Sequence, residues 1–170
     1  MSISKFSAQH CVAKYRVGVF VDSLNIFCST RDRWGKVIDH SKLMKIALAG
    51  HKLYRGFVYA VRFNDRFDSW VSAIEAYGFK VKSREPGRKL DGSVEANWDV
   101  GIITDIARIS PKLDMVVLVS GDGDFADALT ACRKDGKIVR VIGVEGFTHH
   151  KLKDIADEFT PITEDMLLSH

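Results

Sequence analysis

Residues 115–124 have the sequence MVVLVSGDGD, in which five consecutive apolar residues lead into a turn with two acids. An unbroken apolar run of this length is typical of a strand buried on both faces of a parallel sheet. Residues 17–21, with the sequence VGVFV, form a second such run and continue directly into Asp22. Two predicted inner strands therefore end in acids: Asp22 on one, and Asp122 and Asp124 on the other.

Strands and helices alternate along the rest of the chain. Apolar runs predict further strands at residues 57–63, 79–81 and 138–142. Helical spacing of apolar residues predicts helices at 41–49, 66–77 (capped by Asp65), 95–109 and 125–134, and a last helix that contains Leu152, Ile155 and Phe159. Residues 82–93 contain Pro86 and two glycines but no apolar periodicity, so we expect a surface loop there.

Strands separated by helices form a parallel sheet through right-handed crossovers. We therefore predict the α/β fold class, a three-layer α/β/α sandwich with a central, mostly parallel sheet. The domain is expected to span residues 16–160, between a flexible N-terminal leader at 1–15 and a C-terminal tail at 161–170. In open sheets of this kind, functional groups lie beyond the carboxyl ends of the strands, where the strand order reverses.

The charges of the chain are unevenly distributed. Its 170 residues contain 25 Lys and Arg against 22 Asp and Glu, a formal net charge of only +3. Residues 1–90, however, hold 17 basic and 7 acidic side chains, whereas residues 91–170 hold 8 and 15. Such an asymmetry points to a polyanionic partner or a metal site.

Composition excludes several classes of protein. Hydrophobic residues make up 46% of the chain and charged residues 28%, which is ordinary for a folded domain and excludes disorder. No apolar run approaches the ~20 residues of a membrane span, and the N-terminus lacks the apolar core of a secretory signal. Cys11, Cys28 and Cys132 are too scattered for a disulfide framework or a metal knuckle. We expect a cytoplasmic protein without a membrane partner.

A group of acids is predicted at one edge of the sheet. Asp22, Asp122 and Asp124 converge if their two strands are neighbours, and crowded carboxylates either share protons or hold a cation. Asp99 joins them, because its position on the predicted helix shares the apolar face with Ile102. Hard oxygen ligands of this kind suit Mg²⁺ or Mn²⁺. Asp105, rotated away from that face, is expected to be an ordinary solvated acid.

Each candidate also has a purely structural explanation. Asp22 and Asn25 are common capping and turn residues after a strand, and Asp122 and Asp124 are common turn formers beside glycine. Asp99 in the first turn of a helix favourably opposes the helix dipole. The two explanations stay open for each residue, although two acidic strand ends in one chain favour a site.

The basic half of the chain contains candidates for nucleic-acid binding. A predicted basic loop contributes Lys82, Arg84, Arg88 and Lys89, and a polar segment after the first strand contributes Arg31 and Arg33. Such residues contact phosphates, and Trp34 beside them is available to stack on a base. The alternative for the loop is a solvated surface segment.

Four segments in order resemble the NYN domain family, a member of the PIN-like nuclease superfamily, over about residues 16–160. They are VFVDSLN at 19–25, ANWDV at 96–100, VSGDGDF at 119–125, and the late Leu152 with ADEF at 156–159. Relatives often have Gly at the position of Ser23 and Lys near that of Glu95. The second difference adds negative charge beside Asp99.

The resemblance implies a PIN-like sandwich, in which the strand at 17–21 lies beside that at 115–119, and a magnesium- or manganese-dependent nuclease. It implies catalytic roles for Asp22, Asn25, Asp99, Asp122 and Asp124, with the four aspartates as metal ligands and Ser120 as a polar support. The expected activity is hydrolysis of phosphodiester bonds in single-stranded RNA. DNA as substrate and a homodimer both stay open. The alternatives are a catalytically weak module that binds RNA or a protein partner, and a small-molecule phosphatase.

Overall fold

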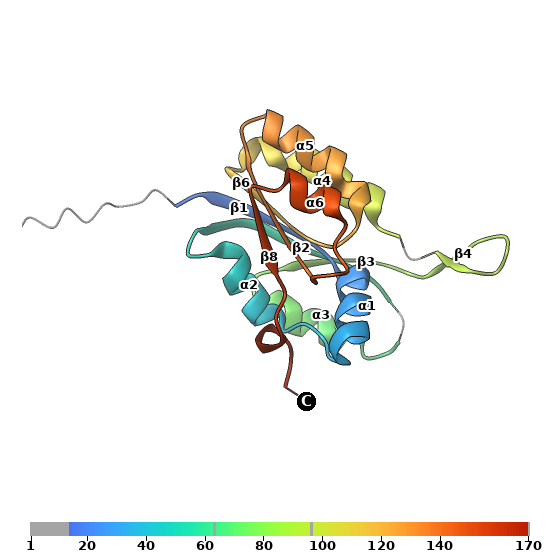
Figure 1. The fold of residues 1–170 in the computed structure, drawn as a ribbon. Coiled ribbons are helices and arrows are strands. Elements are labelled where there is room, and N and C mark those ends of the chain that lie inside the picture. The colour runs from blue at the N-terminus through green and yellow to red at the C-terminus, as the bar shows by residue number, and fades with distance from the viewer. Residues whose placement is uncertain (1–13, 63, 96, 170) are drawn as a thin grey trace, which may run out of the picture.

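The computed structural model describes residues 14–62, 64–95 and 97–169. A single parallel sheet, with strand order β3-β2-β1-β6-β7-β8, forms its centre (Figure 1). The strands of this sheet are β1 (Arg16–Asp22), β2 (Lys52–Val61), β3 (Lys80–Arg84), β6 (Met115–Val119), β7 (Ile138–Gly143) and β8 (Glu158–Pro161). A two-stranded antiparallel hairpin is made by β4 (Gly87–Arg88) and β5 (Val94–Glu95).

Helices cover both faces of the sheet, as Figure 1 shows. One layer consists of α1 (Ser23–Trp34), α2 (His40–Leu48) and α3 (Phe67–Ala76), and the other of α4 (Asp99–Ile109), α5 (Ala126–Lys134) and α6 (His150–Ile155). Short 3₁₀ turns lie at η1 (Ser110–Lys112), η2 (Gly123–Phe125) and η3 (Glu164–Met166). Successive side chains of a strand point to opposite faces, so Val19 and Val21 pack in the first layer and Phe20 in the second. The predicted three-layer α/β sandwich is confirmed.

The strand order reverses between β1 and β6. Chain connections run outward from β1 through β2 to β3, and outward from β6 through β7 to β8. Val21 of β1 pairs with Val119 of β6 in parallel register. Because the two strands end at the same level, Asp22 and Ser120 emerge side by side at the carboxyl edge, where sheets of this type carry their sites.

Some element boundaries differ from those predicted. The helix expected from residue 95 begins only at Asp99, and Arg66, not Asp65, is the N-cap of α3. The predicted loop at 82–93 is partly wrong, because β3 continues to Arg84 and the rest folds into the β4–β5 hairpin. Pairing of β5 with the nearby β4 keeps residues 94–95 out of the helix, and pairing with β2 extends β3 to Arg84.

Phe159 belongs to a strand, not to the last helix. Helix α6 ends at Ile155, and the backbone NH of Asp157 bonds the carbonyl of Val139 at 2.8 Å. The chain then continues as β8 alongside β7, with Phe159 opposite Val141. Apolar residues three or four apart fit a short helix followed by a strand as well as one longer helix, so spacing alone could not separate them.

The last residues of the chain lie against the domain. Within 161–170, where we expected a tail, Ile162, Met166 and Leu167 are buried in the core on the α1–α3 side of the sheet. Leu167 also forms a β-bridge with Ile38, just before α2. The leader at 1–15 lies largely outside the described residues, as does Cys11.

Asp105 corrects another expectation, because it is buried and not solvated. Only 6% of the residue is exposed, and its carboxylate accepts hydrogen bonds from Tyr59 Oη at 2.8 Å and Lys82 Nζ at 2.6 Å. Arg108, one turn further along α4, donates a third at 2.9 Å. Burial alone would raise the pKa of Asp105, but the bonds from Lys82, Arg108 and Tyr59 hold it below its usual range.

Replacing Asp105 should therefore destabilise the fold. We expect Asp105→Ala to lower the free energy of unfolding at pH 7 by about 2 to 4 kcal/mol, because Lys82 and the Tyr59 hydroxyl lose their buried partner. The carboxylate has a depressed pKa, so its contribution is present at neutral pH and is lost as the pH falls through the folded-state value. Urea denaturation at pH 7 and at acidic pH measures both effects. Asp32→Ala, at an exposed position of α1, is the control, and equal losses from the two variants would contradict the buried role of Asp105.

Candidate metal centre

Asp22 occupies the junction between β1 and α1. It is the N-cap of the helix, and its Oδ1 accepts the backbone NH of Asn25 at 3.3 Å. Its Oδ2 accepts a hydrogen bond from Ser120 Oγ at 3.1 Å. Asp22 is therefore an N-cap, as its structural explanation predicted, and it also bonds Ser120 at the end of the neighbouring strand.

Asn25 and Ser120 connect the first strand end to the second. Asn25 Oδ1 accepts the backbone NH of Gly121 at 2.8 Å, which ties α1 to the turn after β6. Ser120, which is fully buried, also accepts the backbone NH of Asp122 at 3.2 Å. These bonds hold the turn at 120–124 in one position relative to Asp22.

The glycines of this turn make room for a neighbouring segment of the chain. A Cβ on Gly121 would lie 2.3 Å from the backbone carbonyl oxygen of Phe147, and one on Gly123 would lie 2.7 Å from the ring of His149. The backbone NH of His149 also bonds the carbonyl of Gly121 at 2.9 Å. Gly121 and Gly123 thus let residues 147–149 pack directly against the acidic turn.

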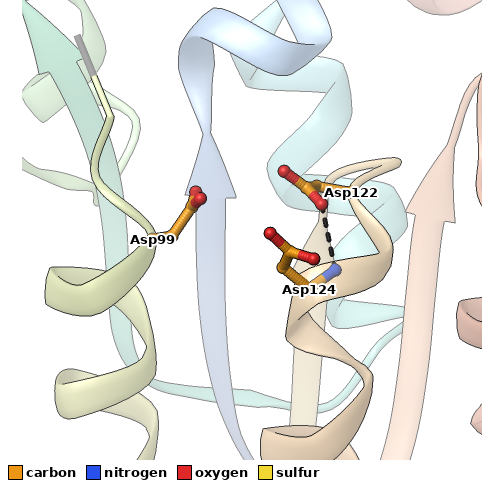
Figure 2. Close-up of side chains that lie close together, drawn as sticks. All are labelled: Asp99, Asp122 and Asp124. Carbon is orange, nitrogen blue, oxygen red and sulfur yellow. Dashed lines mark hydrogen bonds between the residues drawn. The ribbon is translucent and has the colours of Figure 1, made fainter. Parts of the chain in front are cut away.

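Three carboxylates meet at this edge. Asp99, Asp122 and Asp124 each offer an oxygen atom, and these atoms all lie within 4.8 Å of one another. Figure 2 shows Asp99, at the start of α4, facing the other two across the end of β1. The carboxylate of Asp122 also accepts the backbone NH of Asp124 at 2.9 Å. We call these three residues the acidic cluster.

Asp22 lies beside the acidic cluster, not within it. Burial raises the pKa of Asp22 from 3.8 to about 6, bonds from Asn25 and Ser120 oppose the shift, and the charges of Asp99 and Asp122 add to it. Of the four ligands predicted from the sequence, Asp99, Asp122 and Asp124 therefore lie within reach of one cation. The fourth is coupled to them electrostatically and through Ser120.

Asn97 is a site residue that the sequence analysis did not single out. Its side-chain amide donates to Asp99 Oδ2 at 2.6 Å, and its amide oxygen accepts the backbone NH of Asp99. Burial, together with the charges of Asp122 and Asp124, raises the pKa of Asp99, and the Asn97 bond opposes this shift. The available signal was Asn two residues before Asp at a helix start, a common local turn.

The donor set of the acidic cluster fits a hard divalent cation. All three groups are carboxylates, which are the ligands that Mg²⁺ and Mn²⁺ prefer in proteins. Burial is the main cause of the raised pKa of Asp99, and the charges of Asp122 and Asp124 add to it, a repulsion that a bound cation would relieve. The arrangement has the chemistry of a divalent-metal site.

The predicted basic residues occupy three different places. Arg31 and Arg33 lie at the far end of α1, about 14 Å and about 17 Å along the helix from Asp22. Lys82 is engaged with Asp105, and Arg84 stacks on Trp98 at 3.7 Å while donating to the carbonyl of Asn97. The remaining two, Arg88 and Lys89, lie exposed in and beside the β4–β5 hairpin. Only Arg84 contacts a residue that bonds the acidic cluster directly.

Trp34 is poorly placed for the base stacking that we expected. It is partly buried and packs against the hydrophobic core on the α1–α3 side of the sheet. The guanidinium of Arg33 lies over its ring, 5.0 Å from the centroid, and also donates to the carbonyl of Glu145. The Trp34 ring therefore packs against the core and against Arg33 at the end of α1.

The fold and this site together define a class: doubly wound α/β domains with an acidic site at the point where the strand order reverses. The model of the NYN domain matches residues 16–164, and the chain belongs to this family. The predicted family membership is thereby confirmed. Among the described residues, no helix is long and apolar enough to cross a membrane.

Several known proteins are similar to this chain. The "Low amplitude and bright protein LabA" of Synechococcus elongatus is 29% identical over 164 residues, covering 88% of this chain and 84% of that protein. "Uncharacterized protein MJ0482" of Methanocaldococcus jannaschii is 25% identical, and the match spans 91% of this chain but only 58% of that protein's length. The crystal structure of protein VPA0982 from Vibrio parahaemolyticus superposes with a TM-score of 0.86 at 31% identity, covering 92% and 98% of the two chains.

The raised pKa of Asp22 makes a prediction about stability. Asp22 holds its proton more tightly in the folded chain than in the unfolded chain, so its contribution to stability falls as the pH rises from about 4 to about 6. Asp22→Asn keeps a capping side chain but removes the charge. We expect the variant to be about 1 to 3 kcal/mol more stable than the wild type at pH 7.5 without divalent metal, and equal to it near pH 3.5.

Urea denaturation across this pH range, in the presence of a chelator, measures the difference. Asp32→Asn, which removes an exposed charge from the same helix, is the matched control and should leave the difference near zero. An Asp22→Asn variant that is less stable than the wild type at pH 7.5 would show that the carboxylate stabilises the fold.

Proposed function

We propose that this protein is a divalent-metal-dependent ribonuclease that hydrolyses phosphodiester bonds in single-stranded RNA. The observation that carries the proposal is the acidic cluster, with three carboxylate oxygens within 4.8 Å of one another at the carboxyl edge of an NYN-domain sheet. The family is related to nucleases, and the cluster has the ligand chemistry that a metal-dependent nuclease uses.

Asp99, Asp122 and Asp124 would hold Mg²⁺ or Mn²⁺, with Asp22 as a neighbouring carboxylate that Ser120 connects to the same turn. The cation would supply charge stabilisation on the phosphate and a water of lowered pKa. It is also required on electrostatic grounds, because a cluster of bare carboxylates repels a phosphodiester.

The protein's own contribution is to fix these groups before substrate arrives. Asn97 orients the Asp99 carboxylate through its side-chain bond, and Ser120 holds both Asp22 and the backbone of Asp122. Asn25 fixes the turn through the backbone NH of Gly121. Preorganised groups of this kind need little rearrangement when charge develops on the substrate.

Basic residues near α4 supply the attraction for RNA. The β4–β5 hairpin projects from the body of the domain next to the start of α4, where Asp99 lies (Figure 1). Arg88 and Lys89 of this segment are exposed, and Arg84 approaches the cluster through Asn97. In this proposal they contact phosphates that flank the scissile bond, whereas Arg31 and Arg33 contact more distant nucleotides.

Removing one carboxylate of the cluster should abolish cleavage. We expect Asp122→Asn to lower the rate of cleavage of labelled single-stranded RNA in Mn²⁺ by about 100-fold or more, because the substitution removes a charged ligand but keeps the hydrogen bond to the Asp124 backbone. Asp127→Asn, an exposed acid in the first turn of α5, is the matched control and should cleave like the wild type.

The same experiment separates the alternatives. Equal cleavage by wild type and Asp122→Asn would contradict the proposed site. No cleavage by the wild type, with retained RNA binding in a filter assay, would favour a catalytically weak RNA-binding module instead. Turnover of a phosphomonoester without RNA cleavage would indicate a phosphatase, and parallel assays with single-stranded DNA determine the choice of nucleic acid.

A second prediction concerns the salt dependence of RNA binding. Each phosphate contact on a single strand contributes about 0.7 to the slope of log affinity against log salt concentration. The double variant Arg88→Ala/Lys89→Ala should therefore bind RNA more weakly and lower the slope by about 1.4. The double variant Lys112→Ala/Lys134→Ala removes two exposed charges that precede the amino ends of β6 and β7. It should change neither the affinity nor the slope. A slope unaffected by the hairpin variant would exclude this segment from the RNA interface.

A further inference from the structure

Phe147 is an exposed aromatic residue at the carboxyl edge of the sheet. It lies in the loop that follows β7, and 43% of the residue is exposed. Its backbone carbonyl oxygen packs against Gly121, where a Cβ would lie only 2.3 Å from it. An exposed aromatic residue therefore adjoins the turn that carries Asp122 and Asp124.

Hydrogen bonds fix the loop at 144–149 in place. The backbone NH of Phe147 bonds the carbonyl of Val144 at 3.0 Å, which closes a turn within the loop. The backbone NH of His149 bonds the carbonyl of Gly121 at 2.9 Å, which ties the loop to the acidic turn. The backbone of Phe147 is thus held in place before a ligand arrives, and this lowers the entropic cost of binding.

Arg33 contacts the other end of this loop. Its Nη1 atom donates to the backbone carbonyl of Glu145 at 2.9 Å and lies 3.9 Å from the position that a Cβ on Gly146 would take. The carboxylate of Glu145 pairs with Lys153, and Arg33 forms no ion pair with an acid among the described residues. The guanidinium of Arg33 is therefore available to a phosphate.

These contacts place Phe147 between the acidic turn and a cation. Asn25, near the start of α1, bonds Gly121 of the turn, and Arg33 lies eight residues further on, about 12 Å along the helix. The acidic cluster would hold the scissile phosphate through its metal ion, and Arg33 would hold another phosphate of the same strand. A base between these two phosphates would reach the exposed ring, and every base has a face that can stack on it.

We propose that Phe147 is a stacking platform for one nucleobase of single-stranded RNA, on a strand that runs from the acidic cluster toward Arg33. The identity of this ligand rests on the proposed function. Bases of a single strand are free to stack on aromatic side chains, whereas paired bases of a duplex are not. One ring also offers far less apolar area than the roughly 800 Å² per partner of a stable protein interface, which favours a base over a protein.

The test measures RNA binding without cleavage. Full-chain Asp122→Asn, whose cleavage should be slow enough for a binding measurement, is titrated in Mn²⁺ with two fluorescein-labelled strands of equal length, oligoadenylate and its abasic counterpart. Adding Phe147→Ala should weaken the binding of oligoadenylate by about 5- to 140-fold, the effect expected for the loss of one stacked base. The affinity for the abasic strand should stay the same, and Phe147→Trp should retain the binding of oligoadenylate.

Two controls separate stacking from other effects. Tyr77→Ala in the same background removes an aromatic residue of similar exposure, 46%, at the end of α3, and it should leave both affinities unchanged. Phe147→Ala removes no phosphate contact, so the slope of log affinity against log salt concentration should not change. Circular dichroism of each variant checks that the fold is retained.

The remaining outcomes distinguish this inference from the proposed function. Equal affinity for oligoadenylate with and without Phe147→Ala would overturn the platform and leave the nuclease proposal intact. An equal loss for the abasic strand would show that the ring only supports the loop, and absence of binding by Asp122→Asn would also overturn the platform. A wild type that cleaves no RNA, with the effect of Phe147→Ala present, would contradict the nuclease and keep the platform. A dimer that Phe147→Ala dissociates, with RNA affinity unchanged, would assign the ring to a second copy of the chain.

Discussion

The parallel pairing of β1 with β6 is the constraint on which the site depends. These strands adjoin in the sheet although they are far apart in the sequence, and their register brings Asp22 beside Ser120. Burial of both strands makes the register costly to change, because a slip by one residue would turn the apolar side chains to the wrong faces. The hydrophobic core therefore supplies the energy that holds repelling carboxylates together, and the polar bonds of Ser120 and Asn25 determine how those carboxylates are oriented.

Two buried titratable groups give the stability of this fold opposite dependences on pH. Asp22 favours the folded state only when protonated, so its contribution decreases as the pH rises from about 4 to about 6. His40, whose pKa is lowered to about 4, is neutral in the fold but charged in the unfolded chain in mildly acidic solution. Its contribution therefore increases with pH from about 4 to 6.5, the reverse of Asp22. The two groups change the stability in opposite directions over the same pH range, so their contributions partly cancel.

Features that depend on local pattern were predictable, and features that depend on distant partners were not. The strand at 115–119 was predicted with its correct bounds because an unbroken apolar run and a Gly-rich turn define it locally. Asp105 was misplaced because its burial depends on Tyr59 and Lys82, which two other strands deliver to the side of α4. For the same reason the role of Asn97 was visible only as a local turn. The place of Phe147 beside the acidic turn could not be predicted, because it depends on contacts between the loop after β7 and the turn after β6.

The fold also changes how the opposite net charges of residues 1–90 and 91–170 are interpreted. Ion pairs within the chain neutralise part of these charges. Arg16 pairs with Asp114, Lys36 with Glu164 and Lys82 with Asp105. Each pair joins a basic residue of the first half to an acid of the second, and the pair of Arg16 with Asp114 lies where β1 and β6 adjoin. A polyanion therefore meets fewer free cations than the sequence count indicates. The exposed Arg88 and Lys89 lie in the segment that leads into the acidic cluster, so position near the site, not total charge, makes this segment the candidate RNA contact.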